Sequence, residues 1–439
     1  MDNDLRKKAL AVYGELPRVI RTRRENGIYT AMGFTSDLDV LLDFQVEKLN
    51  ELLERYVPDG VLEEMKPAPV IRNEKDLLET IVSYCIRGAG GEADMEDIEL
   101  IRSHFSCQNG MGGNAVQAAL ALAQFGGGSI VHLTDDSFEV REQLDYPCIR
   151  VALPDGTLGG SMDLVQKNPQ EIHVILQYQK GNVIRLGKQE AVIPDSNRLI
   201  LNKNTINMIL PLDEDYLTWI ETNARQVSSD MLSSFNYVLE KDMLRQRLER
   251  ILLHVERYRR GNPEGVVYYE DGYYRDMEIR KLCIGMLFPE VDILSMNEEE
   301  LLHTLKLYGE KADLSDILSC VHGVETLIGR FGVKKGVVIH TKDYAMYVGD
   351  RKGFDIEKGM FWGNMLATAK ALFGNYGSDE EVKQVLELPF SEAGLKYRDI
   401  IREHGLENRV VLIPTFYLDK PKYTIGLGDS FTGGMQLCF

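Results

Sequence analysis

The feature that most constrains the fold is a regular alternation of strand-like and helix-like runs from residue 129 onward. Residues 129–134, 291–296 and 336–347 are short runs rich in apolar and β-branched residues, and residues 297–307 form a helical run with a charged face. This alternation is typical of βαβ units, whose strands form a mainly parallel sheet. We therefore predict an α/β fold.

The segment from residue 148 to residue 202 breaks this alternation. It contains four short runs with β character, separated by Gly, Pro and Asn: residues 149–153, 173–178, 182–186 and 198–201. Such runs are typical of antiparallel strands joined by turns. We expect a smaller β-rich lid, formed by about residues 40–70 and 148–202. This lid is inserted into a large α/β domain that comprises the remaining segments, including residues 203–439.

Charge and cysteine content narrow the class of protein. The formal net charge is −18 over 439 residues, so we expect neither a nucleic acid nor an anionic membrane as a partner. Residues 1–24 have no uninterrupted apolar core, and the six cysteines are scattered without a CxxC pair. We expect a cytoplasmic protein with reduced thiols, as a monomer or a small homo-oligomer.

The most informative motif lies near the C-terminus, where Gly426-Leu427-Gly428-Asp429 opens a predicted helix. The N-terminus of a helix binds anions, because its first amides lack acceptors within the helix and the dipole adds partial positive charge. Asp429 either caps this helix or stands beside a bound phosphate and takes the proton of an acceptor hydroxyl. The motif alone leaves both interpretations open.

Two further motifs suit a small polar ligand. Gly112-Gly113-Asn114 opens an Ala-rich helical run and lets the start of that helix approach a ligand closely. Asp37 and Asp39 lie two residues apart at a predicted strand end, so both side chains point to the same side. Carboxylates in this arrangement bind sugar hydroxyls, although solvated loop aspartates are the commoner case.

Phosphate charge needs neutralisation from several sources, because the chain has no GxxxxGK[ST] motif. Magnesium requires carboxylates that hold its water ligands, and we assign Glu256 and Glu300, with Asn297, to this role. Arg198 begins a strand of the expected lid, and a lid arginine reaches the phosphate only on closure.

Taken in order, these motifs resemble those of the ADP-dependent glucokinase/phosphofructokinase family, within the ribokinase superfamily. Gly426-Leu427-Gly428-Asp429 resembles the GxGD catalytic motif of the superfamily, and the likeness extends from Gly33 to Phe439. Four stretches are similar to the HxE, NExE, lid-arginine and HTxxYA-type sequences of the family: residues 254–256, 297–300, 196–198 and 338–345.

The resemblance implies a ribokinase-like large domain of three layers, α/β/α, with a discontinuous β-rich lid. It also implies Mg-ADP as phosphoryl donor, a sugar or sugar phosphate as acceptor, and AMP as product, as in glycolysis. Asp429 becomes the general base, Gly426, Leu427 and Gly428 form the anion hole, and Arg198 contacts the transferring phosphate. The other implied roles are acceptor binding by Asp37, Asp39, Gly112, Gly113, Asn114 and Asn236, nucleotide binding by His340, Thr341, Lys342, Tyr344 and Ala345, and magnesium binding by Glu256, Glu300 and Asn297.

Three departures from the family pattern keep alternatives open. Asp37 stands where relatives more often have Asn, and residues 233–236 match the acceptor-contacting SGxQ/N turn only in part. Residues 430–432 follow the base in the style of ATP-using ribokinases. The alternatives are a ribokinase-like kinase that uses ATP or phosphorylates a nucleoside or another sugar phosphate, and a nucleotide- or sugar-binding relative without turnover.

Overall fold

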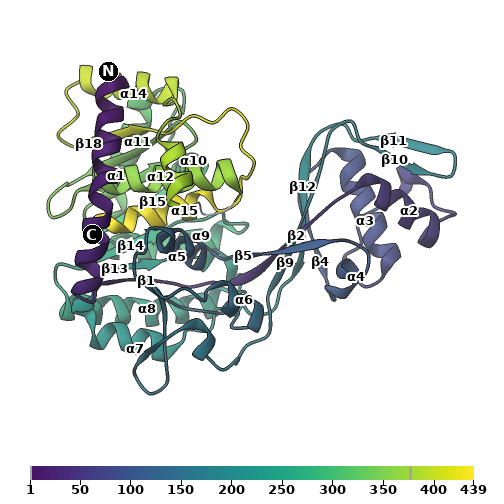
Figure 1. Ribbon diagram of the computed structural model, residues 1–439, viewed down its shortest axis with the longest axis horizontal. Coiled ribbons are helices and arrows are strands. Elements are labelled where there is room, and N and C mark those ends of the chain that lie inside the picture. The colour runs from purple at the N-terminus through teal and green to yellow at the C-terminus, as the bar shows by residue number, and fades with distance from the viewer. Residues whose placement is uncertain (1, 375–377) are drawn as a thin grey trace.

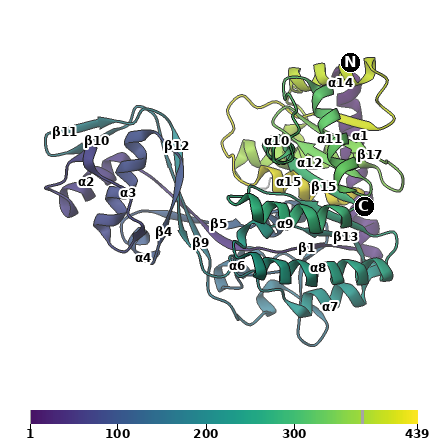
Figure 2. The same ribbon diagram turned by 180° about the vertical axis from the view of Figure 1, so that it is seen from behind.

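The computed structural model describes residues 2–374 and 378–439 and has two domains joined by extended strands (Figures 1 and 2). The large domain contains a ten-stranded sheet in the order β18-β17-β16-β15-β14-β13-β1-β6-β7-β8. The strands from β16 to β7 run parallel, and the outer pairs are antiparallel, which confirms the predicted α/β class. The strands are β1 (Tyr29–Met32), β6 (Ser129–Val131), β7 (Ile149–Ala152), β8 (Leu158–Gly159), β13 (Val227–Leu232), β14 (Val266–Glu270), β15 (Ile293–Asn297), β16 (Gly336–His340), β17 (Tyr344–Gly349) and β18 (Val410–Pro414).

Helices cover both faces of this sheet and give the three expected layers. Alternate residues of a strand point to opposite faces, so Val266 and Tyr268 of β14 enter one core while Val267 and Tyr269 enter the other. The first core is covered by α1 (Asp2–Glu25), α5 (Asn114–Gln124), α12 (Ile356–Phe373), α13 (Asp379–Val385) and α15 (Leu427–Met435). The second is covered by α7 (Glu214–Thr222), α8 (Lys241–Gly261), α9 (Met277–Leu287), α10 (Glu298–Leu307), α11 (Ile317–Phe331) and α14 (Glu392–Glu403).

The smaller domain is a six-stranded sheet in the order β3-β4-β12-β9-β2-β5. Helices α2 (Val46–Tyr56), α3 (Glu74–Arg87) and α4 (Glu99–Arg102) cover its outer face, so the other face is directed toward the large domain (Figure 1). Val174 and Leu176 of β9 are buried in the core beneath these helices, whereas His173 and Gln177 alternate onto the open face. The strands are β2 (Asp37–Leu42), β3 (Val70–Ile71), β4 (Gly91–Met95), β5 (Cys107–Gly112), β9 (Ile172–Tyr178) and β12 (Asn197–Lys203), with a separate hairpin of β10 (Val183–Leu186) and β11 (Gln189–Val192).

The boundaries of this smaller domain differ from those that we expected for the lid. Residues 149–152 form β7 and pair with β6 in the large sheet. Conversely, the smaller sheet includes β4 and β5, which lie outside residues 40–70 and 148–202. The predicted lid boundaries were wrong because strand pairs in this sheet join segments far apart in the sequence, and such pairs leave no local sequence pattern. β4 pairs with β12, and β2 pairs with β5.

Some further observations concern the whole chain. All six cysteines are free thiols in the structure. Within the described residues, no helix is both long enough and apolar enough to cross a bilayer.

A charged cluster lies between α7, α8 and β13, with His254 and Asp230 at its buried end. The Nε2 atom of His254 lies 3.2 Å from Asp230 Oδ2, and its Nδ1 atom lies 3.0 Å from Glu221 Oε1. Burial disfavours the imidazolium, but these two carboxylates raise the pKa of His254 to about 9. Arg250 and Arg257 complete the cluster at 3.0 Å and 2.8 Å from Glu221. The cluster therefore fixes α8 against the sheet.

We predict that His254→Gln lowers the free energy of unfolding by about 3–5 kcal/mol near pH 6, because Asp230 loses its buried counter-charge. The folded-state pKa lies above the ordinary value of 6.5, so the contribution is complete below about pH 6.5 and is lost as the pH rises through about 9. Urea unfolding of both proteins at about pH 6 and about pH 10 measures this. A difference between the two proteins that does not shrink at the higher pH contradicts the assignment.

Candidate active site

The C-terminal glycine motif forms the start of α15. Gly426 has a positive φ of 64°, and the helix begins at Leu427. A Cβ atom at Gly426 would collide with the Gln117 side chain and would stand 2.7 Å from Lys370 Nζ, so the position requires glycine. The first amides of α15 lack helical acceptors and, with the helix dipole, form an anion site.

Asp429 lies in the first turn of α15 and keeps part of its surface exposed. Desolvation raises its pKa to about 7, Glu270 and Asp37 add to the shift, and Lys370 opposes it. Burial, followed by the charge of Asp37, also raises the pKa of Asp39 to about 7. A carboxylate with a pKa near 7 is matched to proton transfer at neutral pH.

A cavity of 360 Å³ opens at the start of α15. Three of the predicted nucleotide residues line it from the end of β16, together with residues from β15, α10 and α15: His340, Thr341, Lys342, Asn297, Glu298, Leu427 and Gly428. Tyr344 and Ala345 do not line it, because the chain turns back at Thr341 and carries them into β17. Ala345 is fully buried there, and Tyr344 packs edge-on against Tyr397.

Carboxylates surround His340 beside this cavity. Glu270, the last residue of β14, lies 2.9 Å from His340 Nε2 and accepts a hydrogen bond of 2.8 Å from Thr432. Glu300 and Asn297 cap α10 through reciprocal hydrogen bonds of 2.9 Å. Burial, followed by the charge of Asp271, raises the pKa of Glu300 to about 8. A divalent cation relieves this accumulation of negative charge, so Glu270 and Glu300 fit magnesium held through its water ligands.

Glu256, which we assigned to magnesium, lies elsewhere, and the structure contradicts that assignment. Its side chain is 62% exposed and pairs with Arg260 at 2.5 Å on the surface of α8. Residues two positions apart in an α-helix point in directions that differ by roughly 200° around the helix axis. Because His254 is buried, Glu256 therefore points toward solvent. Glu270, which lies beside His340, has a position that fits this role instead. The sequence signal that could have identified Glu270 was an acidic residue at the carboxyl end of an apolar strand, because parallel sheets bind ligands at that edge.

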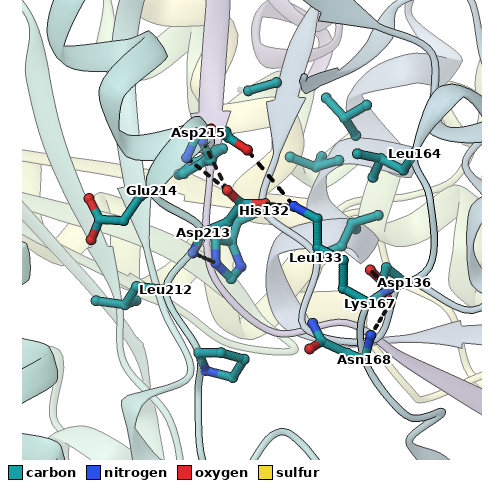
Figure 3. Close-up of a pocket in the computed structure, with 15 residues that line it drawn as sticks. His132, Leu133, Asp136, Leu164, Lys167, Asn168, Leu212, Asp213, Glu214 and Asp215 are labelled. Atoms are coloured by element: carbon teal, nitrogen blue, oxygen red, sulfur yellow. Dashed lines mark hydrogen bonds and ion pairs between the residues drawn. The ribbon is translucent and has the colours of Figure 1, made fainter. Parts of the chain in front are cut away.

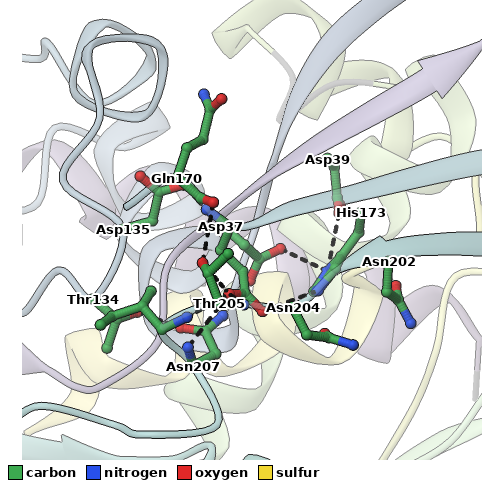
Figure 4. Close-up of polar contacts among 12 residues, drawn as sticks. Asp37, Asp39, Thr134, Asp135, Gln170, His173, Asn202, Asn204, Thr205 and Asn207 are labelled. Atoms are coloured by element: carbon green, nitrogen blue, oxygen red, sulfur yellow. Dashed lines mark hydrogen bonds and ion pairs between the residues drawn. The ribbon is translucent and has the colours of Figure 1, made fainter. Parts of the chain in front are cut away.

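Asp37 and Asp39, two of the predicted acceptor residues, lie where strands cross between the domains (Figure 4). The Oδ1 atom of Asp37 lies 3.0 Å from His173 Nδ1, and Asp39 lies 3.9 Å from the same nitrogen. Gly112 pairs with Asp37 in the sheet, and a Cβ atom there would collide with the Asp37 carboxylate. Gly113, with a φ of 92°, then leads into α5 at Asn114. The structure therefore brings the two motifs together.

A cavity of 260 Å³ adjoins these residues on the open face of the smaller sheet. His173 and Asn202 line it from the smaller domain, and Asn236 and Arg275 line it from the large domain. Arg275 forms an ion pair with Glu92 of β4 across the gap. Polar side chains from both domains thus face one space, as binding of a hydroxyl-rich ligand requires.

Arg198 is exposed on β12, opposite Gln177 of β9. Residues 198, 200 and 202 share a face of this strand, so Arg198 is on the same open face as Asn202. In this arrangement of the domains, Arg198 is not among the residues that line the cavities of 260 and 360 Å³.

A third cavity, of 290 Å³, lies beside β6 and the start of α7 (Figure 3). Several of its polar groups already have partners within the protein, and the Tyr216 hydroxyl is buried without a hydrogen-bond partner among the described residues. The His132 Nε2 atom accepts a hydrogen bond of 2.9 Å from the Asp213 backbone, and Asp136 accepts one of 2.8 Å from Lys167. The Lys167 ammonium lies 3.8 Å from Asp215. We therefore do not assign a ligand to this cavity.

Lys370 and His173 are site residues that sequence reasoning missed. Lys370 lies within α12, and His173 is the second residue of β9, so neither belongs to a glycine motif. Only the pairing of distant segments brings them beside Asp39. No local signal in the chain identified them.

A helix N-terminus beside carboxylates, at the carboxyl edge of a parallel sheet, defines an α/β enzyme of the phosphoryl-transfer class. Residues 29–437 match the sequence profile of the ADP-specific phosphofructokinase/glucokinase conserved region. The chain belongs to this family.

Individual relatives agree with this assignment. The chain is 24% identical to the ADP-specific phosphofructokinase of Pyrococcus furiosus, over 95% of this chain and 97% of the relative. It is also 24% identical to the ADP-dependent glucose/glucosamine kinase of that organism, over 91% and 92% respectively. A solved ADP-dependent kinase in complex with fructose 6-phosphate and ADPβS has the same fold, with a TM-score of 0.72 at 18% identity and coverage of 98% and 97%.

We predict that Glu270→Gln weakens magnesium-dependent turnover by about 10- to 100-fold, the usual effect of disturbing the groups around a metal. Glu256→Gln, on the surface of α8, is the matched control and is expected to resemble the wild-type protein. Turnover of the Glu270→Gln and Glu256→Gln variants, measured as a function of magnesium concentration, distinguishes the two effects. Equal losses in both variants contradict the placement of the metal ligands.

Proposed function

We propose that this protein transfers the terminal phosphoryl group of Mg-ADP to a hydroxyl group of a sugar or sugar phosphate and releases AMP. The observation that carries this proposal is the position of Asp429. It lies in the first turn of α15, whose Gly428 lines the cavity of 360 Å³, and its charge interacts with that of Asp39 on the acceptor side. The names of the relatives support ADP as the donor.

In the proposed reaction, Asp39 and the turn at Gly113 and Asn114 hold the acceptor. Asp429 takes the hydroxyl proton while the acceptor oxygen bonds to phosphorus and the bond from phosphorus to the bridging oxygen of ADP breaks. The amides at the start of α15 stabilise the transferring oxygens. Magnesium, when bound near Glu270 and Glu300, neutralises phosphate charge.

The acceptor class is part of the proposal and follows from the cavity between the domains. This cavity contains the cation Arg275 and the anion Glu92, which are paired with each other. Glu92 is suited to accept hydrogen bonds from the hydroxyl groups of a neutral sugar, and Arg275 is suited to bind the phosphate of a sugar phosphate. The proposal therefore covers both acceptors.

A coupled assay of AMP formation tests this function with ADP and ATP against glucose, glucosamine, fructose 6-phosphate and nucleosides. We expect ADP to be the better donor and a sugar or sugar phosphate to be the acceptor. Equal or faster turnover with purified ATP contradicts the donor assignment. Nucleotide binding without turnover of any acceptor identifies a non-catalytic relative instead.

We predict that Asp429→Asn lowers turnover by about 10²- to 10⁴-fold, the usual loss for a general base, and leaves nucleotide affinity nearly unchanged. The base acts in its deprotonated form, so kcat/KM of the wild-type enzyme should rise as the pH increases through about 7. The pH–rate profile of the variant should lack this rise. A variant with near-normal turnover would make Asp429 a helix cap only.

We also propose that the smaller domain is a lid that brings Arg198 to the phosphate on closure. Arg198→Ala should then reduce kcat far more than it weakens acceptor binding, because the contact forms mainly in the transition state. Lysine should restore activity only in part, since it lacks the planar fork of arginine. Small-angle scattering should show a smaller radius of gyration with nucleotide and acceptor. An unchanged profile at saturation, with normal turnover of the alanine variant, refutes the lid assignment.

A further inference from the structure

Lys370 is a buried cation at the centre of the site, and the mechanism above gives it no role. It lies within α12, which packs along α15, and its side chain is only 4% exposed. Its ammonium donates a hydrogen bond to Gln117 Oε1 of α5. Three helices of one layer therefore contribute to its position.

The position of the Lys370 ammonium relative to α15 is the main observation. A Cβ atom added to Gly426 would stand 2.7 Å from Lys370 Nζ. Gly426 is the residue directly before the free amides of α15. The ammonium thus lies beside the same anion site as those amides, and it approaches from the large domain.

Two carboxylates interact electrostatically with this ammonium. Burial lowers the pKa of Lys370 to about 8, whereas the charges of Asp429 and Asp39 oppose this shift. Asp429 is the proposed base, and Asp39 is a proposed acceptor ligand. An incoming phosphoryl group carries negative charge on its oxygens and would be repelled by both carboxylates. A cation at this point offsets that repulsion.

We propose that Lys370 is a catalytic residue that contacts the oxygens of the transferring phosphoryl group from the large-domain side. This proposal rests on the function proposed above. Lys370 keeps its proton and forms no covalent bond, so its contribution is electrostatic. It places one positive charge at the anion site in the arrangement of the domains described here, independently of Arg198 on the smaller domain.

The proposal makes a specific prediction about nucleotide binding. The terminal phosphate of ADP reaches the anion site, and AMP lacks this group. Lys370→Met, which keeps the length of the side chain, should lower ADP affinity by about 10-fold or more, as for loss of a hydrogen bond to a charged group. AMP affinity should stay within about twofold of the wild-type value. Titration calorimetry with magnesium and without acceptor measures both affinities.

Lys358→Met is the matched control. Lys358 lies on the same helix, is partly exposed and pairs with Glu15 at 2.9 Å on the outer surface. The Lys358→Met variant should bind ADP and AMP like the wild-type protein. In steady-state assays, Lys370→Met should lower kcat by about 10²-fold, the usual loss for one preorganised donor, with little change in the KM of the acceptor.

Two outcomes overturn the proposal. If Lys370→Met binds ADP as tightly as the wild-type protein, or loses ADP and AMP affinity equally, Lys370 serves only to neutralise Asp39 and Asp429. If this variant does not fold, Lys370→Gln decides by the same comparison. Failure of the proposed function is distinguishable, because the wild-type protein would then turn over no acceptor while its preference for ADP over AMP still depends on Lys370.

Discussion

The carboxylate of Glu171 ties together the chain segments that connect the two domains. It is fully buried and accepts hydrogen bonds of 2.8 Å from the Thr205 hydroxyl and the Ile206 amide, just after β12. The backbone amide of Glu171 donates a 2.9 Å hydrogen bond to the side chain of Asp135, which follows β6. Segments far apart in the sequence are thus joined at one point (Figure 4). His173 lies 3.8 Å from this carboxylate and 3.0 Å from Asp37, so the proposed acceptor site and the domain connection are the same region of the molecule.

This arrangement concentrates negative charge around the proposed acceptor residues and the start of α15. Asp39 interacts electrostatically with Asp37 and Asp429, and both Asp429 and Glu300 interact with Glu270, in a chain whose net charge is already −18. The buried cations offset the negative charge of these carboxylates only in part. Burial, with the charges of neighbouring carboxylates adding to it, raises the pKa values of Asp39, Asp429 and Glu300. Binding of an anionic nucleotide therefore has to bring positive charge with it or find it in the site.

The parts of the fold with local signals were predictable from the sequence. The alternation of strand and helix predicted the parallel sheet, and the glycines around Gly426 predicted a helix start with Asp429 in its first turn. Both patterns reflect the chemistry of a few consecutive residues. The pairing of Asp37 with Gly112 was not visible, although each motif was recognised by itself.

Other features depend on tertiary structure and had no such signal. Glu256 and Glu270 both follow apolar residues, but only Glu270 lies at the end of a strand of the sheet. Nothing in the local sequence of Lys370 marks it, because its position depends on the packing of α12 against α15 and on the hydrogen bond to Gln117 of α5. The lid boundaries failed for the same reason, because strand pairing over long separations cannot be deduced from local alternation.

The strand order of the large sheet has a consequence for the order in which the protein is synthesised. β1 lies between β6 and β13, so its first partner emerges from the ribosome about one hundred residues later and its second about two hundred residues later. Folding of the central sheet is therefore delayed until much of the chain exists, and β1 needs protection from other partners in the meantime. The base and the anion site arrive later still, with α15. A nascent chain therefore passes through intermediates that hold the proposed acceptor residues but lack the helix that carries the proposed base.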